Sequence, residues 1–442
     1  MSKLSRRELF KLAGTAGIAF GAASAGSKIL SSTGILPDLN LFSDMAYAKE
    51  FTDFAIGKDK KSYGADGIKA GTTIDKGNYK QFPQLKQLMP DHLYRRLSGN
   101  WKTPLPPIHI VPTRKFKIYP TELEWAKKNF GVAKLNYKTM KLENYQAGIP
   151  FLEPKTATEV VFNYDKGRNE GGDDAYYQNY TFRNFDKFDR VKDLKLKTWI
   201  KQRIGRCTLP PVPEYPNNPE RIWRMLFTLF TGPYDVAGTS ALRFTYDKAK
   251  DDDSWLYIPA MRRIRRAAGA DYQDPLFGTD VPFDDFVWFI QKIDYKKVVP
   301  ISVDEGRLLA YAFPKKVVDG HTLKNDGRQL IYPYGWEIKD VYVITFKITD
   351  PSYCYGMRKI WIDKTNYMPF RGEYYDQKGR LWRDWSGAYS CDEETGAKTQ
   401  VFNEVEDVIN GSKTFDFFDH PKYNSPIDDK VFTQSFMKSQ GR

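Results

Sequence analysis

The sequence has 442 residues, 41% hydrophobic and 28% charged, with a mean hydropathy of -0.58. These values describe a globular chain and exclude a multispan membrane protein, because no apolar run reaches the roughly 18 to 20 residues of a spanning helix. Aromatic residues make up 15% of the chain and favour strands, which predicts a large β core. The net charge of +13 comes from 68 basic and 55 acidic residues, which permits anionic partners. We expect no nucleic acid among them.

The first 48 residues resemble a twin-arginine export signal. Arg6 and Arg7 precede the mild apolar stretch Leu12 to Ala25, which is too short to span a bilayer. Two small-residue cleavage sites follow, and we prefer Ala46-Tyr47-Ala48 because Lys49 then opens a polar mature chain. The alternative is an amphipathic helix that stays attached. The signal predicts that the twin-arginine translocase exports the protein to the periplasm after folding.

The mature chain begins with a segment that has little apolar periodicity. It runs from Lys49 to about Lys80 and is rich in Gly, Lys and Asp, so we expect a poorly packed lead-in. A helix is predicted over Thr121 to Phe130, where Thr121 and Glu124 form a capping box and Gly131 ends the helix.

From about residue 157 the sequence breaks into short aromatic and β-branched runs between Gly, Pro, Asn and Asp clusters. This rhythm predicts an antiparallel sheet or open barrel with few helices. The run Ile222 to Phe230 suits either a helix or a strand buried on both faces, and we favour the strand. The other expected strands are Glu159 to Tyr164, Leu242 to Tyr246, Trp255 to Pro259, Val341 to Thr349, Lys359 to Asp363 and Phe370 to Tyr375.

The sequence carries none of the common catalytic or metal-binding motifs. It has no nucleophile elbow, phosphate loop or dinucleotide fingerprint, and its four histidines lack metal-ligand spacing, so no cofactor or metal is expected. The acidic pairs Asp173-Asp174 and Asp284-Asp285 cannot form a general acid and base pair without a loop, because adjacent residues on a strand point to opposite faces, and they are expected as solvated turns. Among three cysteines, Cys354 and Cys391 are the pair to test for a bridge, although we favour free thiols.

Several motifs together carry a family resemblance. They are Tyr145-Gln146-Ala147-Gly148-Ile149-Pro150-Phe151, Gly232-Pro233, Trp255-Leu256-Tyr257-Ile258-Pro259, Arg262-Arg263-Ile264-Arg265-Arg266, Gly278-Thr279-Asp280, Phe283-Asp284-Asp285-Phe286 and Trp361-Ile362-Asp363-Lys364. Over about Pro112 to Phe415 the chain resembles periplasmic proteins related to the lipoprotein carriers of the LolA and LolB type, most closely the domain of unknown function family 1329 (DUF1329). Leu152 departs from the pattern, which has a second proline there.

The resemblance implies a mainly β fold. The expected architecture is a strongly curved antiparallel sheet, a LolA/LolB-like half-barrel, with a few helices forming a lid over an apolar cavity. The chain then divides into the signal peptide (1–48), the lead-in (49–111), the half-barrel domain (112–415) and a C-terminal tail (416–442).

The same resemblance predicts a periplasmic binding or carrier protein for a lipid or other hydrophobic molecule, moved towards the outer membrane. An outer-membrane barrel protein and an export pump are possible partners. Two alternatives stay open. One is an exported hydrolase of a lipid-like ester, with Ser240 or Ser254 and one of the histidines as catalytic pair; the other is a ligand-free periplasmic adaptor. We expect no enzyme.

Seven residues are predicted to contact a ligand or partner. We expect Trp223, Trp255 and Tyr257 on strands that line the cavity, although any single aromatic is more often core. The other four are Arg262, Arg263, Arg265 and Arg266. Their guanidinium groups either pair with Asp284 or Asp285, or donate to a cargo head group or an acidic partner surface.

Overall fold

The computed structural model describes residues 68–114, 118, 120–137, 139–167, 172–247, 250–267, 273–285, 288, 298–314, 323–325, 329–391, 398–419 and 421–441. The chain divides into two units, Met1–Phe54 and Ala55–Arg442, and every described residue belongs to the second. The predicted export signal, with Arg6, Arg7, Ala46 and Ala48, therefore lies outside the described residues. Within the described part, no helix combines the length and apolar character needed to cross a membrane.

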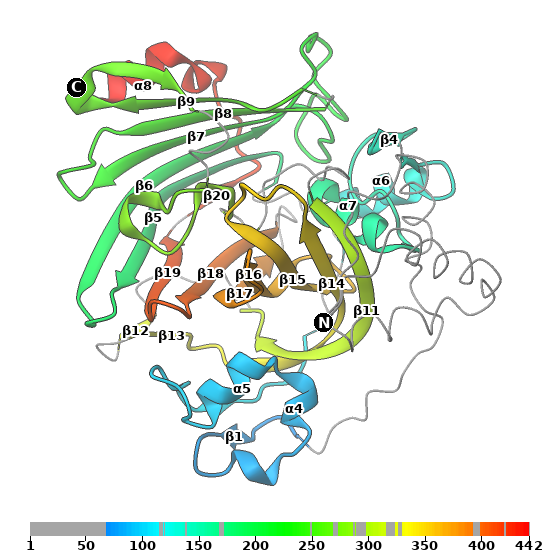
Figure 1. Cartoon of the computed structure of the whole chain (residues 1–442). Helices are drawn as coiled ribbons and strands as arrows, with labels where there is room; N and C mark the ends of the chain where they lie inside the picture. Colours follow the sequence, from blue (N-terminus) through cyan, green and yellow to red (C-terminus); the bar gives the residue numbers. More distant parts are fainter. Residues whose placement is uncertain are drawn as a thin grey trace, which may run out of the picture. The chain divides into compact units, whose positions relative to one another are not determined.

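One large antiparallel sheet dominates the second unit (Figure 1). Its strands are β5 (Asp174–Phe185), β6 (Val191–Gln202), β7 (Ile222–Gly232), β8 (Ser240–Tyr246), β9 (Asp253–Ile258), β10 (Arg263–Arg266), β11 (Val298–Tyr311), β14 (Trp336–Ile348), β15 (Tyr355–Asp363), β16 (Pro369–Asp376), β17 (Leu381–Cys391), β18 (Lys398–Asp407), β19 (Ser412–Asp419) and β20 (Lys422–Tyr423). In the described residues the order is β10-β9-β8-β7-β6-β5-β19-β18-β17-β16-β15-β14-β11, with β20 beside β5. The edge strands β10 and β11 do not pair with each other, so the sheet is not closed. The predicted mainly β fold is confirmed.

Three short pairs of strands accompany the sheet. They are β1 (Thr73–Ile74) with β2 (Ile108–His109), β3 (Lys134–Asn136) with β4 (Lys141–Glu143), and β12 (Lys324–Asn325) with β13 (Leu330–Ile331).

The middle of the large sheet is covered on both faces. All ten residues of β18 are buried, including its charged ones, although successive side chains of a strand point to opposite faces. We call the face that carries Glu404 and Glu406 the α5 face, and the face that carries Asn403 and Val405 the α7 face.

Short helices cover the α5 face near β11 and β15 to β18. These are α4 (Leu85–Leu88) and α5 (Asp91–Leu97), which lie side by side below the strands in Figure 1. Further along the sheet, η8 (Asp429–Phe432) and α8 (Gln434–Gln440) pack on β7 to β9, where Phe432 and Met437 join a buried cluster with Phe227 and Leu242.

The α7 face is covered by α6 (Pro120–Asn129), α7 (Ala157–Gly167) and part of the connection between β10 and β11. The ammonium group of Lys398 binds Glu122 of α6 at 2.5 Å and the carbonyl of Gly167, the last residue of α7, at 3.1 Å. In the connection, η5 (Leu276–Gly278) and η6 (Phe283–Asp285) are short 3-10 helices, as are η2 (Tyr79–Gln81), η3 (Pro259–Met261) and η8 elsewhere in the described residues.

Most predicted elements are confirmed. The predicted helix at Thr121 is α6, and the ambiguous run from Ile222 is the strand β7. Five of the six other predicted runs are the strands β8, β9, β14, β15 and β16. The sheet continues past the predicted domain end at residue 415, since β19 runs to Asp419 and the following residues form η8 and α8.

The prediction of a strand over Glu159 to Tyr164 is wrong, because these residues lie in α7. Thr156 Oγ1 accepts a hydrogen bond from the backbone N–H of Glu159, and the Glu159 carboxylate accepts one from the backbone N–H of Lys155. This is a capping box, and the buried Val160, Val161 and Tyr164 follow helical spacing. The capping and the periodicity outweigh the β propensity of the valines.

Candidate functional site

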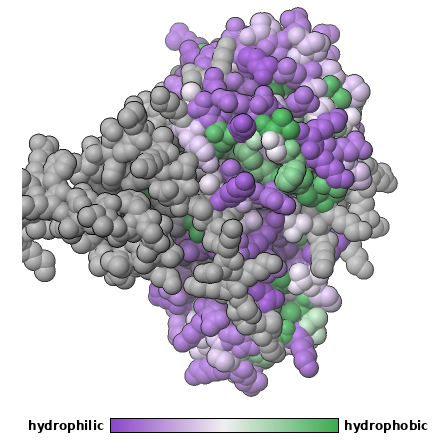
Figure 2. Space-filling view, turned by 90° about the vertical axis from the view of Figure 1, so that its right-hand side faces the viewer, coloured by the Kyte–Doolittle hydropathy of each residue, from purple (hydrophilic) through white to green (hydrophobic). Residues whose placement is uncertain are grey.

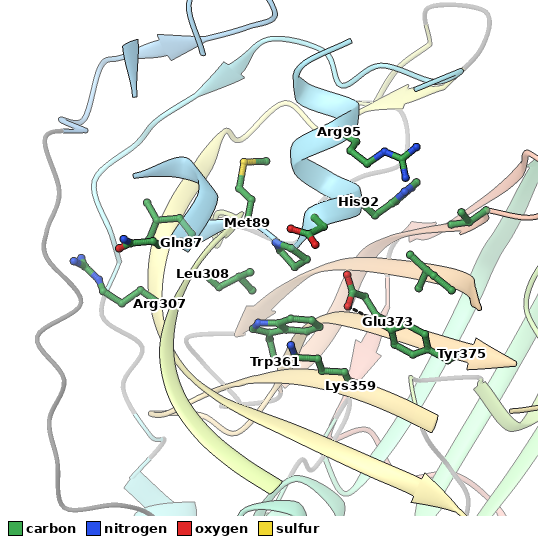
Figure 3. A pocket seen from close by; sticks show the side chains of 15 residues that line it. Gln87, Met89, His92, Arg95, Arg307, Leu308, Lys359, Trp361, Glu373 and Tyr375 are labelled. Carbon is green, nitrogen blue, oxygen red and sulfur yellow. Dashed lines mark hydrogen bonds between the residues drawn. The ribbon is translucent and has the colours of Figure 1, made fainter. Parts of the chain in front are cut away.

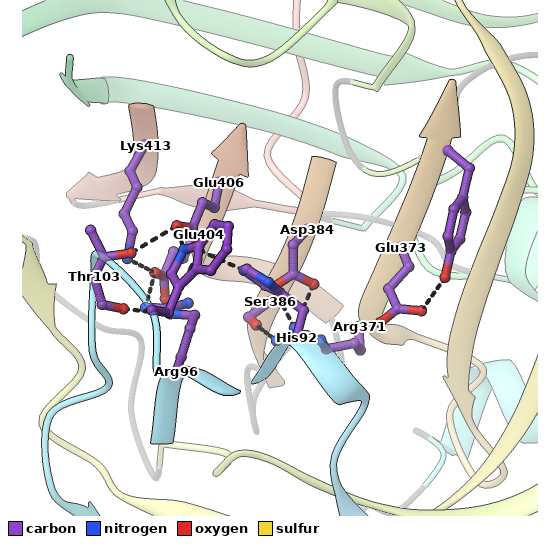
Figure 4. Close-up of polar contacts among 12 residues, drawn as sticks. His92, Arg96, Thr103, Arg371, Glu373, Asp384, Ser386, Glu404, Glu406 and Lys413 are labelled. Atoms are coloured by element: carbon purple, nitrogen blue, oxygen red, sulfur yellow. Dashed lines mark hydrogen bonds and ion pairs between the residues drawn. The ribbon is translucent and has the colours of Figure 1, made fainter. Parts of the chain in front are cut away.

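A row of charged side chains crosses five neighbouring strands on the α5 face, and Figure 4 shows its members on β16 to β19. Antiparallel register places Lys359 of β15 opposite Glu373 of β16, Glu373 opposite Asp384 of β17, Asp384 opposite Glu406 of β18, and Glu406 opposite Lys413 of β19. Directly opposite residues share one face of a sheet, so all five side chains point to the same side. We call these five residues the charged row.

Helix α5 covers the row and contributes two side chains to it. His92 and Arg96 are four residues apart and therefore share one helix face. His92 Nε2 lies 3.0 Å from Glu406 Oε2 and 3.7 Å from Asp384 Oδ2. Arg96 Nη2 lies 2.6 Å from Glu404 Oε1, and Lys413 Nζ lies 2.9 Å from the same oxygen. Helix and sheet are thus joined by buried ion pairs.

The formal charges of this site balance. Four buried carboxylates (Glu373, Asp384, Glu404 and Glu406) meet three buried cations (Arg96, Arg371 and Lys413) and the half-buried Lys359, and the guanidinium group of Arg371 binds both oxygens of Asp384. Burial alone would raise the pKa of Glu404, but Arg96 and Lys413 outweigh burial and lower its pKa to about 2. The pKa of Glu406 is likewise well below its usual range, because Lys413, Arg96 and His92 outweigh its burial.

His92, Asp384 and Glu406 place one potential metal ligand each within 4.8 Å of one another. Their oxygens already accept other hydrogen bonds, however. Glu406 Oε1 accepts from Trp101 Nε1 at 2.6 Å and from Thr103 Oγ1 at 2.7 Å, and Asp384 is held by Arg371. A divalent ion would add two charges to a balanced buried site, so these residues fit an ion network better than a metal centre.

A pocket of about 660 Å³ opens at the β15 end of the charged row (Figure 3). Its apolar lining comes from α4, the α4–α5 junction and three strands: Leu88, Met89, Pro90, Leu308, Trp361 and Leu381. Three cations also line it, namely Arg95 of α5, Arg307 of β11 and Lys359 of β15. The lining is therefore amphipathic.

Glu373 forms the inner polar wall of this pocket. Its Oε2 accepts a hydrogen bond of 2.7 Å from the hydroxyl of Tyr375, two residues along the same strand. Burial, and then the neighbouring Asp384, raise the pKa of Glu373, while Tyr375, Arg371 and Lys359 lower it by less. Glu373 is the buried acidic residue of the lining, which also holds the three cations.

The four predicted arginines lie at one edge of the sheet. Arg263 to Arg266 form β10, where the three arginines are exposed, and Arg262 precedes the strand in a left-handed conformation with φ of 48°. Arg266 pairs with Asp253. The strand pairs with β9, which places Arg263 opposite Ile258.

The expected pairing of this cluster with Asp284 or Asp285 is wrong. Asp285 is fully buried and accepts hydrogen bonds from Arg358 at 2.7 Å and Tyr355 at 2.6 Å, and Asp284 accepts one of 3.0 Å from Tyr353. The counter-charge of Asp285 is therefore the buried guanidinium group of Arg358 on β15, and not one of the exposed guanidinium groups on β10.

The expectation of solvated acidic turns is wrong as well, since both acidic pairs are buried. Asp173 accepts backbone hydrogen bonds from Cys207, Thr208 and Leu209, and Asp174 pairs with Arg206 at 2.8 Å. The carboxylates of Asp173 and Asp174 are therefore buried partners of the segment 206–209.

Of the predicted aromatic residues, Trp223 and Tyr257 are buried and Trp255 is partly buried. Tyr257 belongs to the cluster with Phe227, Phe432 and Met437, and Trp255 packs against it. Trp223 is 5% exposed, with Lys166 Nζ 3.4 Å from the centre of its ring. In this structure Trp255 and Tyr257 are part of a filled core, and their contact with a ligand stays a prediction.

Cys207 and Cys354 are free thiols. The side chain of Cys391 lies outside the described residues.

The charged row and the pocket were not predicted from sequence. Their members are spread from residue 87 to residue 413, which hides any spacing. One signal was present: Arg371-Gly372-Glu373 and Glu404-Val405-Glu406 place charges at every second position of strands, so that one face of each strand is charged.

Fold and site together define an antiparallel β-sheet protein with an open sheet, a buried ion network and an amphipathic pocket. The chain belongs to the family described as Protein of unknown function (DUF1329), whose sequence model matches residues 73–438. The predicted family is thereby confirmed.

Three individual proteins are similar to this chain. An uncharacterized protein of Pseudomonas aeruginosa is 24% identical over 350 residues, which cover 70% of this chain and 67% of that protein. The structure of a putative outer membrane lipoprotein-sorting protein domain from Vibrio parahaemolyticus is 18% identical, covers 61% of this chain and 92% of its own, and has a TM-score of 0.42. The structure of a DUF1329 family protein from Desulfovibrio piger is 21% identical, with coverages of 60% and 92% and a TM-score of 0.41.

Proposed function

We propose that the protein binds and carries an amphipathic hydrophobic molecule with an anionic head group, such as a lipid or a fatty acid, in the pocket between α5 and the sheet. The observation that carries the proposal is the composition of this pocket, with buried apolar side chains beside three cations. Its volume of about 660 Å³ lies within the range of about 300 to 1,000 Å³ that small-molecule sites have.

The arrangement of the lining suits such a molecule. Leu88, Met89 and Leu308 are buried below the opening, whereas Arg95 is exposed and Arg307 and Lys359 are partly exposed. An apolar chain can therefore lie on the buried residues while its head group meets the cations at the rim. Figure 3 shows Lys359, Trp361 and Glu373 together on one side of the pocket and Arg95 on the helix opposite.

The place of this function is the periplasm, and the cargo moves towards the outer membrane with the help of a barrel protein and an export pump. The support for this part of the proposal is the resemblance of the first 48 residues to a twin-arginine signal and the resemblance of the sequence to the LolA and LolB carriers. Arg262, Arg263 and Arg265 on the exposed edge of the sheet are then proposed contacts for an anionic head group or an acidic partner.

The pocket proposal is tested by calorimetric titration of the mature protein with dodecanoate and with dodecanol. We expect saturable binding of dodecanoate with micromolar Kd, or about 8 kcal/mol. Lys359→Gln should weaken dodecanoate binding by about threefold to tenfold, since one charged contact is lost, and should leave dodecanol binding unchanged. The control is Lys378→Gln, which removes an exposed ammonium group in the turn after β16. No saturable binding, or equal effects of both variants, would contradict the proposal.

The hydrolase alternative has less support in the described residues. Ser240 and Ser254 are buried, and neither hydroxyl has a hydrogen-bond partner there. His92 belongs to the ion network, His109 contacts Thr73, and His321 and His420 lie outside the described residues. Mass spectrometry of organic extracts separates the possibilities: a stoichiometric lipid supports the carrier, an empty protein that cleaves esters supports the hydrolase, and an empty inactive protein supports the adaptor.

A further inference from the structure

Two glycines form a slot on the α7 face of the sheet. Gly372 of β16 and Gly387 of β17 lie beneath the indole ring of Trp288, which comes from the connection between β10 and β11. A Cβ atom on Gly387 would lie 2.4 Å from Trp288 Cζ2, and one on Gly372 would lie 3.3 Å from Trp288 Cζ3. A side chain at position 387 would therefore clash with the indole ring of Trp288, which would have to move. The two strands are shaped to accept a flat group against bare backbone.

Trp288 occupies this slot with a disfavoured backbone conformation and an indole N–H that is unpaired in the described part of the chain. Its side chain is fully buried, yet its backbone has φ of 71°, a left-handed conformation that bulky residues disfavour. Its indole N–H has no hydrogen-bond partner among the described residues, and neither has the indole N–H of Trp385, whose ring centre lies 5.5 Å away. Core residues that have only a packing role rarely combine these features, because buried polar groups are normally paired.

An acceptor without a donor lies beside the same slot. Asn403 Oδ1 is buried, has no partner among the described residues, and lies 2.5 Å from the Cβ position of Gly387. The amide nitrogen of Asn403 is already used by Asp416, at 3.0 and 3.1 Å, so the amide group is fixed with its oxygen towards the slot. A group that occupied the slot and carried a hydroxyl could donate to this oxygen and accept from Trp385.

Trp288 is held at its backbone rather than at its ring. Its carbonyl accepts a hydrogen bond of 2.6 Å from the hydroxyl of Tyr374. Earlier in the same segment, Asp285 is fixed by Arg358 and Tyr355, as described above. The chain beside the slot is thus anchored, whereas the indole N–H of Trp288 makes no hydrogen bond to any residue that the structure describes.

We propose that this slot is a binding site for a flat apolar molecule that bears one hydroxyl, and that Trp288 occupies it as a displaceable substitute for that molecule. The site is separate from the pocket on the α5 face, and the inference does not depend on the function proposed for that pocket. Binding requires the Trp288 ring to leave the slot. The Kd measured for the wild-type protein is therefore the Kd of the free slot divided by the fraction of molecules in which the slot is free.

The test uses 1-naphthol, a flat molecule with one hydroxyl, and naphthalene, which lacks the hydroxyl, in calorimetric titrations of the mature protein. Trp288→Ala removes the competing ring and should tighten 1-naphthol binding by tenfold or more. Tyr374→Phe keeps the slot but removes the anchor of the Trp288 carbonyl, and should tighten binding by about fivefold, the effect of one hydrogen bond. Both variants should bind naphthalene more weakly than 1-naphthol.

Tyr332→Phe is the matched control. Tyr332 is also a buried tyrosine whose hydroxyl donates to a backbone carbonyl, that of Ala312, at 2.7 Å, but it packs against Tyr311 and Phe402 on the α5 face. Its loss should leave 1-naphthol affinity unchanged.

Three outcomes would overturn the proposal: a folded Trp288→Ala protein that binds 1-naphthol no better than wild type, a Tyr374→Phe protein without any gain in affinity, or equal affinity for both ligands. The Tyr374→Phe result decides alone if Trp288→Ala does not fold.

Discussion

The buried carboxyl group of Asp284 makes a specific prediction about pH and stability. Asp284 is 5% exposed and accepts one hydrogen bond from Tyr353. Burial raises its pKa from the ordinary 3.8 to about 6, although Arg243, Arg358 and Tyr353 oppose the increase. The native protein therefore binds this proton more tightly than the unfolded chain does.

The sign and size of the effect follow from proton linkage. The stability that protonated Asp284 contributes is fully present below pH 3.8 and is lost as the pH rises to about 6. A shift of about two pKa units corresponds to about 3 kcal/mol of unfolding free energy. Asp280, whose pKa burial also raises to about 6, acts in the same range. Glu404, with a pKa of about 2, acts in the opposite direction and loses its stabilising effect as the pH falls from 4.5 to 2.

We therefore expect maximum stability near pH 4. The measurement is urea unfolding followed by circular dichroism at several values between pH 4 and pH 7. In Asp284→Asn the decrease in unfolding free energy over this range should be smaller than in wild type by about 3 kcal/mol. Asp235→Asn, which alters an exposed carboxylate, should match wild type. Parallel curves for Asp284→Asn and wild type would refute the reasoning.

Three further predictions concern separate parts of the chain. Arg371→Met removes the counter-charge of buried Asp384 and should lower the unfolding free energy by about 3 to 5 kcal/mol in urea titrations; a loss below 1 kcal/mol would contradict a buried ion network. Met437→Ala should cost about 2 to 5 kcal/mol, because its side chain is fully buried under α8, and an unchanged melting temperature would show that α8 is not part of the core. Replacing Arg6 and Arg7 by lysine should leave the unprocessed protein in the cytoplasm, as fractionation and blotting would show; normal periplasmic amounts would exclude a twin-arginine signal.

The strands were predictable because their sequence pattern and their surroundings agree. In the run Val341 to Thr349, buried residues of β14 such as Ile344 and Phe346 alternate with half-buried ones, so local preference and tertiary packing favour the same structure. The helix α7 was not predicted although its signals are local: the β-branched Val160 and Val161 favour a strand, whereas the capping box of Thr156 and Glu159 favours a helix.

The site was less predictable, since it depends on which face of a strand another element covers. Glu404 and Glu406 lie on either side of Val405, so their side chains share one face of the strand, as on a half-solvated strand. That charged face is buried only because α5, which lies some 300 residues earlier in the sequence, packs against it. Asp285 illustrates the same limit: its partner is Arg358, 73 residues away, and not an arginine nearby.

The contact of α5 with β18 also has a consequence for the order in which the chain can fold. His92 and Glu406 are separated by 314 positions, so they can meet only after almost the whole chain has been synthesised. A growing or truncated chain that ends before Glu404 leaves the side chain of Arg96 without its carboxylates, and α5 then has no charged surface on which to dock. Helix α5 therefore cannot complete its contacts with the sheet until β18 has been made, although α5 itself is made more than 300 residues earlier.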